Sequence, residues 1–124
     1  MIDMTKKVII HSQDQLRFIS QSDITYCKSD NCYTTIYLSN NEEYVVCKSL
    51  TKMYKELEPD VFIRINQSYI INKNYIRLID KRKKTVELVG SKQIPFTTTI
   101  RTLLTLIGES AAAMFFFVML FGIK

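Results

Sequence analysis

The chain has 124 residues and a mass of 14.5 kDa, the size of one ordinary domain. Apolar residues make up 47% and charged residues 23%, with three Gly and two Pro, which excludes a disordered or fibrous chain. The formal net charge of +5 is unevenly placed, since residues 1–60 carry −2 and residues 61–124 carry +7. An anionic partner is therefore expected to bind the second half. A basic face that serves only solubility would give the same composition.

Five short strands are predicted in the first half, because β-branched, aromatic and other apolar residues run between turn-forming residues. They span residues 7–11, 15–19, 24–28, 32–38 and 43–47. The first two flank Ser12-Gln13-Asp14 and predict a hairpin, with the single histidine, His11, at a strand end and without a catalytic role. Ser39-Asn40-Asn41 predicts a tight turn, because Asn tolerates positive φ.

A helix is predicted over residues 50–57, with Ser49 as its cap and Pro59 beyond its end. Its apolar residues have the spacing of one helix face: Leu50, Met53, Tyr54 and Leu57.

The second half predicts four more strands and a final helix. The strands span residues 62–65, 75–79, 85–89 and 92–96, and Pro95 favours an edge position for the last. A turn is expected at Asn66-Gln67-Ser68, and the basic run Lys81–Lys84 is expected at a hairpin turn. Thr97 or Thr98 would cap a helix over residues 99–107.

Cys27, Cys32 and Cys47 are an odd number without a Cys-x-x-Cys pair, and the N-terminus lacks an apolar secretory segment. Reduced thiols in a cytoplasmic protein are expected. The cysteines alternate with polar residues in strand-like runs, so we expect three small buried hydrophobic residues, with a redox switch as the alternative.

The sequence offers no combination of residues for catalysis. It has no Gly-rich phosphate loop, no paired histidines for a metal and no nucleophile beside a histidine. Glu58 and Asp60 flank Pro59, where carboxylates are usually solvated. We expect no enzyme activity, no metal and no cofactor.

Residues 111–123 carry no charge. As a helix they would be about 20 Å long, short of the roughly 30 Å hydrocarbon core of a bilayer. We therefore expect a domain at residues 6–107 and an apolar C-terminal tail of unknown role at residues 108–124. Self-association through the tail is favoured over membrane contact, and a foreign chain end is a further alternative.

The string from Phe62 to Ile79 resembles the signature of the LytTR family of bacterial DNA-binding domains. The family pattern of an aromatic residue, Arg, a polar pair, Ser and Asn falls here on Phe62, Arg64, Asn66-Gln67, Ser68 and Asn72. Four further segments also resemble the family: Asp23-Ile24-Thr25-Tyr26, Asn31-Cys32-Tyr33-Thr34, the predicted helix at residues 50–57, and Ile94-Pro95-Phe96-Thr97.

This resemblance implies a mainly β fold of small packed antiparallel sheets with short α-helices. It also implies a sequence-specific transcription regulator that reads major-groove base edges of double-stranded DNA, at direct-repeat sites, from loops and turns. Many members carry a receiver domain upstream, so the chain is either a stand-alone regulator or a fragment. The alternative is a membrane-tethered or protein-interaction module that uses the apolar tail.

The family's contact segments imply base-contact candidates at Asn31, Asn66, Gln67 and Thr98. Candidates for phosphate contacts are Lys28, Arg64, Ser68, Lys73, Lys92, Thr97 and Arg101. An Asn or Gln amide can bind adenine bidentately. Asn66-Gln67 could instead cap backbone groups of the turn, Arg64 could pair with an acidic neighbour, and the basic turn could raise affinity without specificity.

Overall fold

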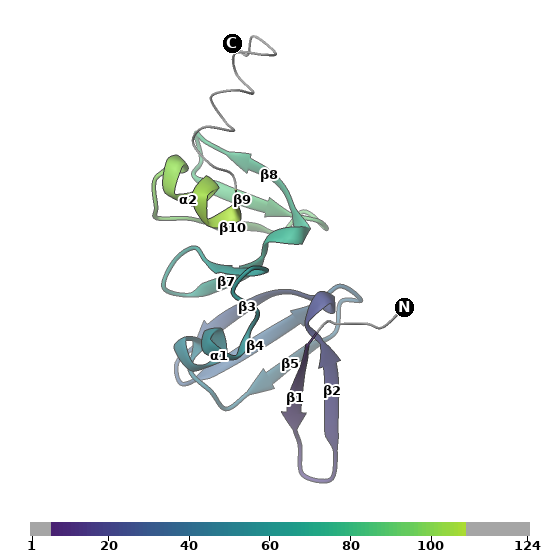
Figure 1. The fold of residues 1–124 in the computed structure, drawn as a ribbon. Coiled ribbons are helices and arrows are strands. Elements are labelled where there is room, and N and C mark those ends of the chain that lie inside the picture. The colour runs from purple at the N-terminus through teal and green to yellow at the C-terminus, as the bar shows by residue number, and fades with distance from the viewer. Residues whose placement is uncertain (1–5, 109–124) are drawn as a thin grey trace.

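The structure is a computed structural model that describes residues 6–108, and it is built mainly from antiparallel strands (Figure 1). The strands are β1 (Lys7–His11), β2 (Leu16–Ser20), β3 (Ile24–Asp30), β4 (Tyr33–Leu38), β5 (Glu43–Val46), β6 (Phe62–Arg64), β7 (Tyr69–Asn72), β8 (Ile76–Asp80), β9 (Thr85–Leu88) and β10 (Gln93–Pro95). The helices are α1 (Leu50–Glu56) and α2 (Ile100–Ile107), and single 3-10 turns lie at Gln21–Asp23 and Lys73–Tyr75. The predicted mainly β fold is confirmed.

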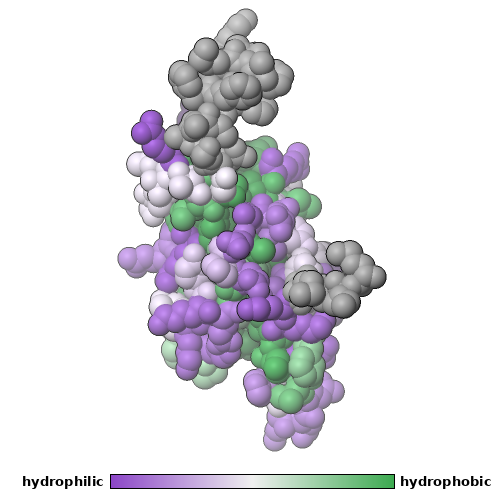
Figure 2. Space-filling view, viewed as in Figure 1, coloured by the Kyte–Doolittle hydropathy of each residue, from purple (hydrophilic) through white to green (hydrophobic). Residues whose placement is uncertain are grey.

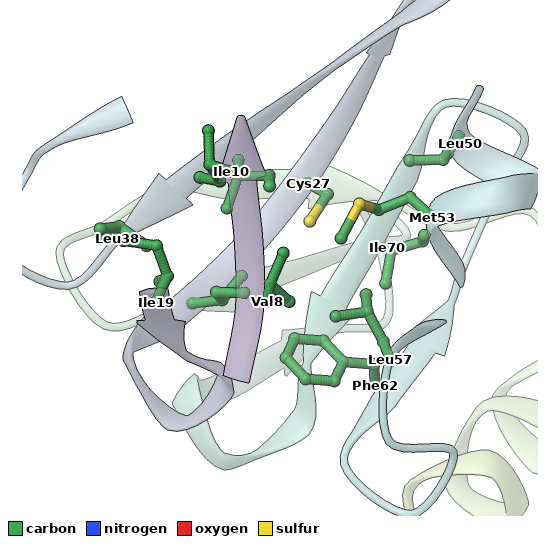
Figure 3. Packing of buried hydrophobic residues seen from close by; sticks show 12 residues of the cluster. Val8, Ile10, Ile19, Cys27, Leu38, Leu50, Met53, Leu57, Phe62 and Ile70 are labelled. Atoms are coloured by element: carbon green, nitrogen blue, oxygen red, sulfur yellow. The ribbon is translucent and has the colours of Figure 1, made fainter. Parts of the chain in front are cut away.

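A five-stranded sheet in the order β5-β4-β3-β7-β6 lies at the centre, with the β1–β2 hairpin and the three-stranded sheet β10-β9-β8 packed beside it. Successive residues of a strand point to opposite faces, so Ile70 and Ile71 of β7 enter two different cores. The first core lies between this sheet, the hairpin and α1, where Met53 and Phe62 are fully buried (Figure 3). The second core lies between β6–β7, the three-stranded sheet and α2.

Strand β7 was not predicted, although it is an inner strand of the central sheet, between β3 and β6. Its residues Ile70, Ile71 and Asn72 are all buried, because both faces of the strand are covered. A strand buried on both faces lacks the alternation of apolar and polar residues by which strands are recognised. The polar side chain of Asn72 can be buried because its Nδ2 donates to the Ile24 carbonyl over 2.9 Å.

Local signals placed most turns and caps correctly. Ser49 caps α1, with its side chain accepting from the Lys52 N–H. Asn41 has φ 71° in the β4–β5 turn, as its residue type predicts. Pro95 lies on the edge strand β10. The cap of α2 is Thr99, so the predicted caps Thr97 and Thr98 were wrong by one or two residues.

The prediction of three buried cysteines holds only for Cys27. Cys27 faces the first core, and burial raises the pKa of its thiol to about 12. Cys32 lies in the β3–β4 turn and Cys47 follows the end of β5, and both are exposed. Alternation along the sequence does not reveal where a strand ends, and outside a strand a side chain no longer alternates between two faces.

The β1–β2 hairpin projects from the body of the molecule and carries hydrophobic surface (Figure 2). Its outward face includes Ile9, Leu16 and Phe18, of which Phe18 is 58% exposed. This strip contributes nothing to the first core, which the hairpin reaches through Val8, Ile10 and Ile19 on its other face.

The apolar tail lies outside the described residues, and so do the predictions made for it. The last described residue, Gly108, ends α2 with φ 113°, a conformation that favours glycine. Over residues 6–108, no helix is both long and apolar enough to span a bilayer.

Candidate nucleic-acid interface

Three segments that are far apart in the sequence meet along one edge of the molecule. They are the β3–β4 turn (residues 31–32), the β6–β7 turn (residues 65–68) and the segment before α2 (residues 96–99), and together they are called the three-loop edge below. The Ser29 N–H donates to the Ser68 carbonyl over 2.8 Å, and the Thr97 N–H donates to the Ile65 carbonyl over 3.3 Å. The β6–β7 turn therefore lies between the other two segments. It projects between α1 and α2 (Figure 1).

Asn66 holds the β6–β7 turn with both ends of its amide. Its Oδ1 accepts from the backbone N–H of Ser68 at 2.7 Å and of Tyr69 at 2.9 Å. Its Nδ2 donates to the Pro95 carbonyl over 2.6 Å, which joins the turn to the segment before α2. Of the two interpretations of Asn66, these contacts match the one in which the amide caps backbone groups.

Gln67 and Ser68 are the exposed residues of this turn. The Gln67 amide forms no hydrogen bond with another described residue, so both its donor and its acceptor face solvent. A free primary amide at the tip of a braced turn has the chemistry needed to pair with a base edge.

The β3–β4 turn presents Asn31 and Cys32 to solvent, with Asn31 at φ 58°. Asn is among the few non-Gly residues that adopt this conformation readily, so the residue type suits both the turn and a polar contact. Lys28, three residues earlier on β3, is also exposed and pairs in register with Tyr69 of β7.

The segment before α2 divides its three threonines between different roles. Thr99 caps the helix by accepting from the Thr102 N–H over 3.1 Å. Thr97 is exposed, whereas the Thr98 hydroxyl is buried and has no hydrogen-bond partner in the described part of the chain. The base contact predicted for Thr98 stays a prediction, with its hydroxyl turned away from solvent in this structure. Arg101 is exposed in the first turn of α2.

Arg64 does not pair with an acidic side chain within residues 6–108. Its guanidinium donates instead to the Thr51 hydroxyl of α1 at 2.8 Å and to the Gln67 carbonyl at 2.9 Å. The alternative of an acidic partner for Arg64 is therefore not seen in the described residues, where its acceptors are two carbonyls and a hydroxyl.

The basic run Lys81–Lys84 forms the turn between β8 and β9, as predicted. The Phe96 N–H donates to the Lys84 carbonyl over 3.0 Å, so this turn adjoins the three-loop edge. The order of residues in the sequence does not indicate that the basic turn and the three-loop edge are neighbours. They are neighbours because the ends of β9 and β10 are paired, with Thr85 opposite Pro95.

Two of the predicted phosphate contacts lie away from this edge. Lys73 follows β7 at the end opposite the β6–β7 turn. Lys92 lies at the far end of the β9–β10 hairpin, where its Nζ is 5.6 Å from the centre of the Tyr26 ring. A cation over an aromatic face is a stabilising contact within the protein, and it does not need DNA.

A group of tyrosines on the central sheet was missed from the sequence. The Tyr26 and Tyr37 rings stack with centroids 4.3 Å apart, and Tyr69 lies 6.1 Å from Tyr26. Burial and the neighbouring Tyr37 and Tyr69 raise the pKa of Tyr26 to about 12. Tyr26 and Tyr37 are eleven residues apart in the sequence and lie opposite each other on β3 and β4. The register of these two strands is the signal that could have located the stack.

Residues 6–108 contain no group of three or more histidine, cysteine or acidic side chains that could hold a metal ion. Exposed amide, hydroxyl and cationic groups lie on and beside the three-loop edge.

Comparisons with known proteins bear on the family and the fold. The family model described as LytTr DNA-binding domain matches residues 14–107. The transcriptional regulatory protein LytR of Staphylococcus aureus, from strains N315 and MW2, is similar at 32% identity over 72 residues, which cover 58% of this chain and 29% of LytR. The chain therefore spans less than a third of the length of these curated relatives.

A solved structure shows the same fold. It is the LytTr DNA-binding domain of a protein described as a methyl-accepting/DNA response regulator from Bacillus cereus. The TM-score is 0.69 at 20% identity, and the alignment covers 84% of this chain and 98% of that chain.

Proposed function

The chain belongs to the LytTR family of DNA-binding domains, and from this premise we propose that it is a transcription regulator that binds double-stranded DNA with sequence preference through the three-loop edge. Such a regulator acts where the bacterial chromosome is, so the proposal includes a cytoplasmic location. It also includes the direct-repeat target sites that the family resemblance implies. Catalysis has no part in it.

The observation that carries the proposal is the set of hydrogen bonds that joins three distant segments into one edge. These bonds link Ser29 to Ser68, Thr97 to Ile65 and Asn66 to Pro95. A contiguous row of loops held by a rigid sheet is how a β-rich domain can enter a DNA groove without a recognition helix.

Within this edge, Gln67 is our choice for direct base reading. Its amide is exposed and unpaired among the described residues, and it can bind N6 and N7 of adenine together. Asn31 is the second choice, since it is exposed at the adjoining turn. Asn66 acts indirectly, because its amide is engaged with Ser68, Tyr69 and Pro95.

Phosphate contacts fix a protein on the duplex without reading sequence. The exposed groups that flank the edge suit this role, and they are Lys28, Ser68, Thr97, Arg101 and the basic turn Lys81–Lys84. Hydroxyls and backbone N–H groups near the N-terminus of α2 favour an anion, because the helix dipole is positive there.

The proposal is tested by selecting bound duplexes from a random pool with the full chain and measuring affinity in about 150 mM salt, close to physiological ionic strength. We expect the selected site to bind at least about 10³-fold more tightly than random duplex, as specific regulators do. Equal affinity for selected and random duplexes would contradict sequence preference.

Gln67→Ala tests the assignment of base reading. We expect a loss of about 1–3 kcal/mol at the selected site and none on random duplex, because one bidentate base contact is removed. Gln13→Ala is the matched control, since Gln13 is also exposed but lies in the β1–β2 turn. If both variants keep the full preference, base reading belongs to another residue.

A further inference from the structure

The β6–β7 turn is short of support from its own strands. Strand β6 has three residues and β7 has four, and besides the bonds to the Asn66 side chain the turn is closed by one long backbone bond, from the Ile65 N–H to the Tyr69 carbonyl at 3.3 Å. A side chain that reads a base from a loose turn binds more weakly, because the turn must be ordered when DNA binds and this ordering costs binding free energy. Specific binding by Gln67 therefore requires support from outside the turn.

Arg64 provides such support through three donors of one planar group. Its Nη2 donates to the Gln67 carbonyl over 2.9 Å, and its Nε donates to the Asn66 carbonyl over 3.4 Å. Its Nη1 donates to the Thr51 hydroxyl over 2.8 Å. Arg64 thereby ties two carbonyls of the turn to Thr51 of α1, which lies 13 residues earlier in the sequence.

Helix α1 is a fixed point because two of its residues are held in the first core. Leu50 is 3% exposed and Met53 is fully buried. Thr51 lies between them on the exposed side of the first helical turn, where its hydroxyl meets Arg64. The path from the core to Gln67 thus runs through α1, Thr51 and Arg64.

Resting on the proposed function, we propose that Arg64 is a positioning residue for sequence reading: with Thr51 it orients the backbone of Gln67 so that the amide meets its base. The sequence predicted Arg64 as a phosphate contact, a role that needs only its charge. The positioning role needs the fork of donors, which Lys lacks because its ammonium is a single point on a flexible stem.

Arg64→Lys separates these two roles, because it keeps the charge and removes the fork. Measured on the full chain, the ratio of affinities for the selected and random duplexes should fall about tenfold or more, the size of a lost hydrogen bond to a charged group. Affinity for random duplex and its salt dependence should stay unchanged, because the number of cations is the same. An unchanged ratio with weaker binding to both duplexes would overturn the inference in favour of a phosphate contact.

Thr51 offers a second test that leaves the guanidinium in place. Thr51→Val removes the hydroxyl at similar shape and should lower the same ratio, whereas Thr51→Ser keeps the hydroxyl and should preserve it. Thr51 is exposed, so neither change disturbs the core. Equal ratios for Val and Ser would overturn the role of Thr51 in the path.

Amide hydrogen exchange of the turn distinguishes failure of this inference from failure of the proposed function. The amides of Ser68 and Tyr69, which donate to Asn66 Oδ1, should exchange faster in Arg64→Lys and Thr51→Val than in the wild-type chain, with amides of β3 unchanged. If the wild type shows no sequence preference but these amides respond as expected, the proposed function fails and the positioning contact stands. If exchange is unchanged in both variants, the inference is wrong whatever the DNA data show.

Discussion

Asn66 and Gln67 are neighbours with the same functional group, yet the structure gives them different partners. The Asn66 amide faces into the molecule and makes three hydrogen bonds, whereas the Gln67 amide faces solvent. Loss of sequence preference after a change at Asn66 would therefore not identify a base contact, because the turn itself would be altered.

Asn66→Ala should lower the free energy of unfolding by about 1–2 kcal/mol, since two backbone N–H groups lose their acceptor. Asn66→Asp keeps that acceptor but replaces the donor to the Pro95 carbonyl with a carboxylate oxygen that the carbonyl repels, so it should also destabilise the chain. Urea unfolding of the two variants beside wild type measures the difference. A stability of Asn66→Ala equal to wild type would show that the turn does not depend on this side chain.

The raised pKa of the buried Cys27 thiol predicts how the free energy of unfolding depends on pH. Burial raises the pKa of its thiol from the ordinary value of 9.0 to about 12 in the folded state. Above pH 9 the unfolded chain releases this proton while the folded chain retains it, so stability is present below pH 9 and falls as the pH rises towards 12.

Between about pH 8 and pH 10.5, this thiol should account for roughly 2 kcal/mol of lost stability, at about 1.4 kcal/mol for each pH unit above the unfolded pKa. Cys27→Ala should show a shallower decline than wild type in urea unfolding at the two pH values. Cys47→Ala is the matched control, since Cys47 is exposed and should leave the decline unchanged. Equal declines in all three proteins would contradict the assignment.

At the scale of elements, α2 stabilises the molecule through one face only. Leu103 is fully buried in the second core, while Leu106 on the same helix is 40% exposed. Because the segment before α2 is part of the three-loop edge, the position of this helix also fixes where that segment lies.

The same substitution at the two leucines separates burial from helix propensity. Leu103→Ala should lower the free energy of unfolding by about 2–5 kcal/mol, through lost burial and the cavity left behind. Leu106→Ala should cost less than about 1 kcal/mol, because most substitutions of exposed side chains have small effects. Similar losses at both positions, measured by urea unfolding, would show that α2 does not pack as described.

For the whole molecule, the placement of charge matters more than its sum. The +7 net charge of residues 61–124 was assigned to a polyanion-binding half, and the basic turn within it adjoins the three-loop edge through the Phe96–Lys84 bond. A positive group beside the edge attracts DNA without reading it.

Lys81→Gln/Lys83→Gln should weaken binding to selected and random duplexes by similar factors and reduce the salt slope by roughly one unit for each lost phosphate contact. Lys7→Gln/Lys55→Gln changes the net charge equally at exposed lysines of β1 and α1 and should have a smaller effect. Affinity titrations at several salt concentrations measure both. If the two variants weaken binding alike, net charge and not the basic turn attracts the DNA.

The sequence determined the features that depend on near neighbours. Alternation and turn residues were sufficient for nine of the strands, the hairpin at the N-terminus and the helix cap at Ser49, because each signal is carried by residues a few positions apart. The string from Phe62 to Ile79 was sufficient to identify the LytTR family, and the match of the family model over residues 14–107 confirms it.

Only the tertiary structure decided which side chains the candidate interface leaves free. Strand β7, which the sequence pattern missed because both of its faces are buried, brings Ser68 beside Ser29. The packing of the three-stranded sheet brings Pro95 beside Asn66, 29 positions away. Hydrogen bonds between such distant residues exist only after the sheets pack, so no local pattern encodes them. For this reason the sequence could name Asn66, Gln67 and Arg64 as candidates but could not say which of them holds the turn and which faces solvent.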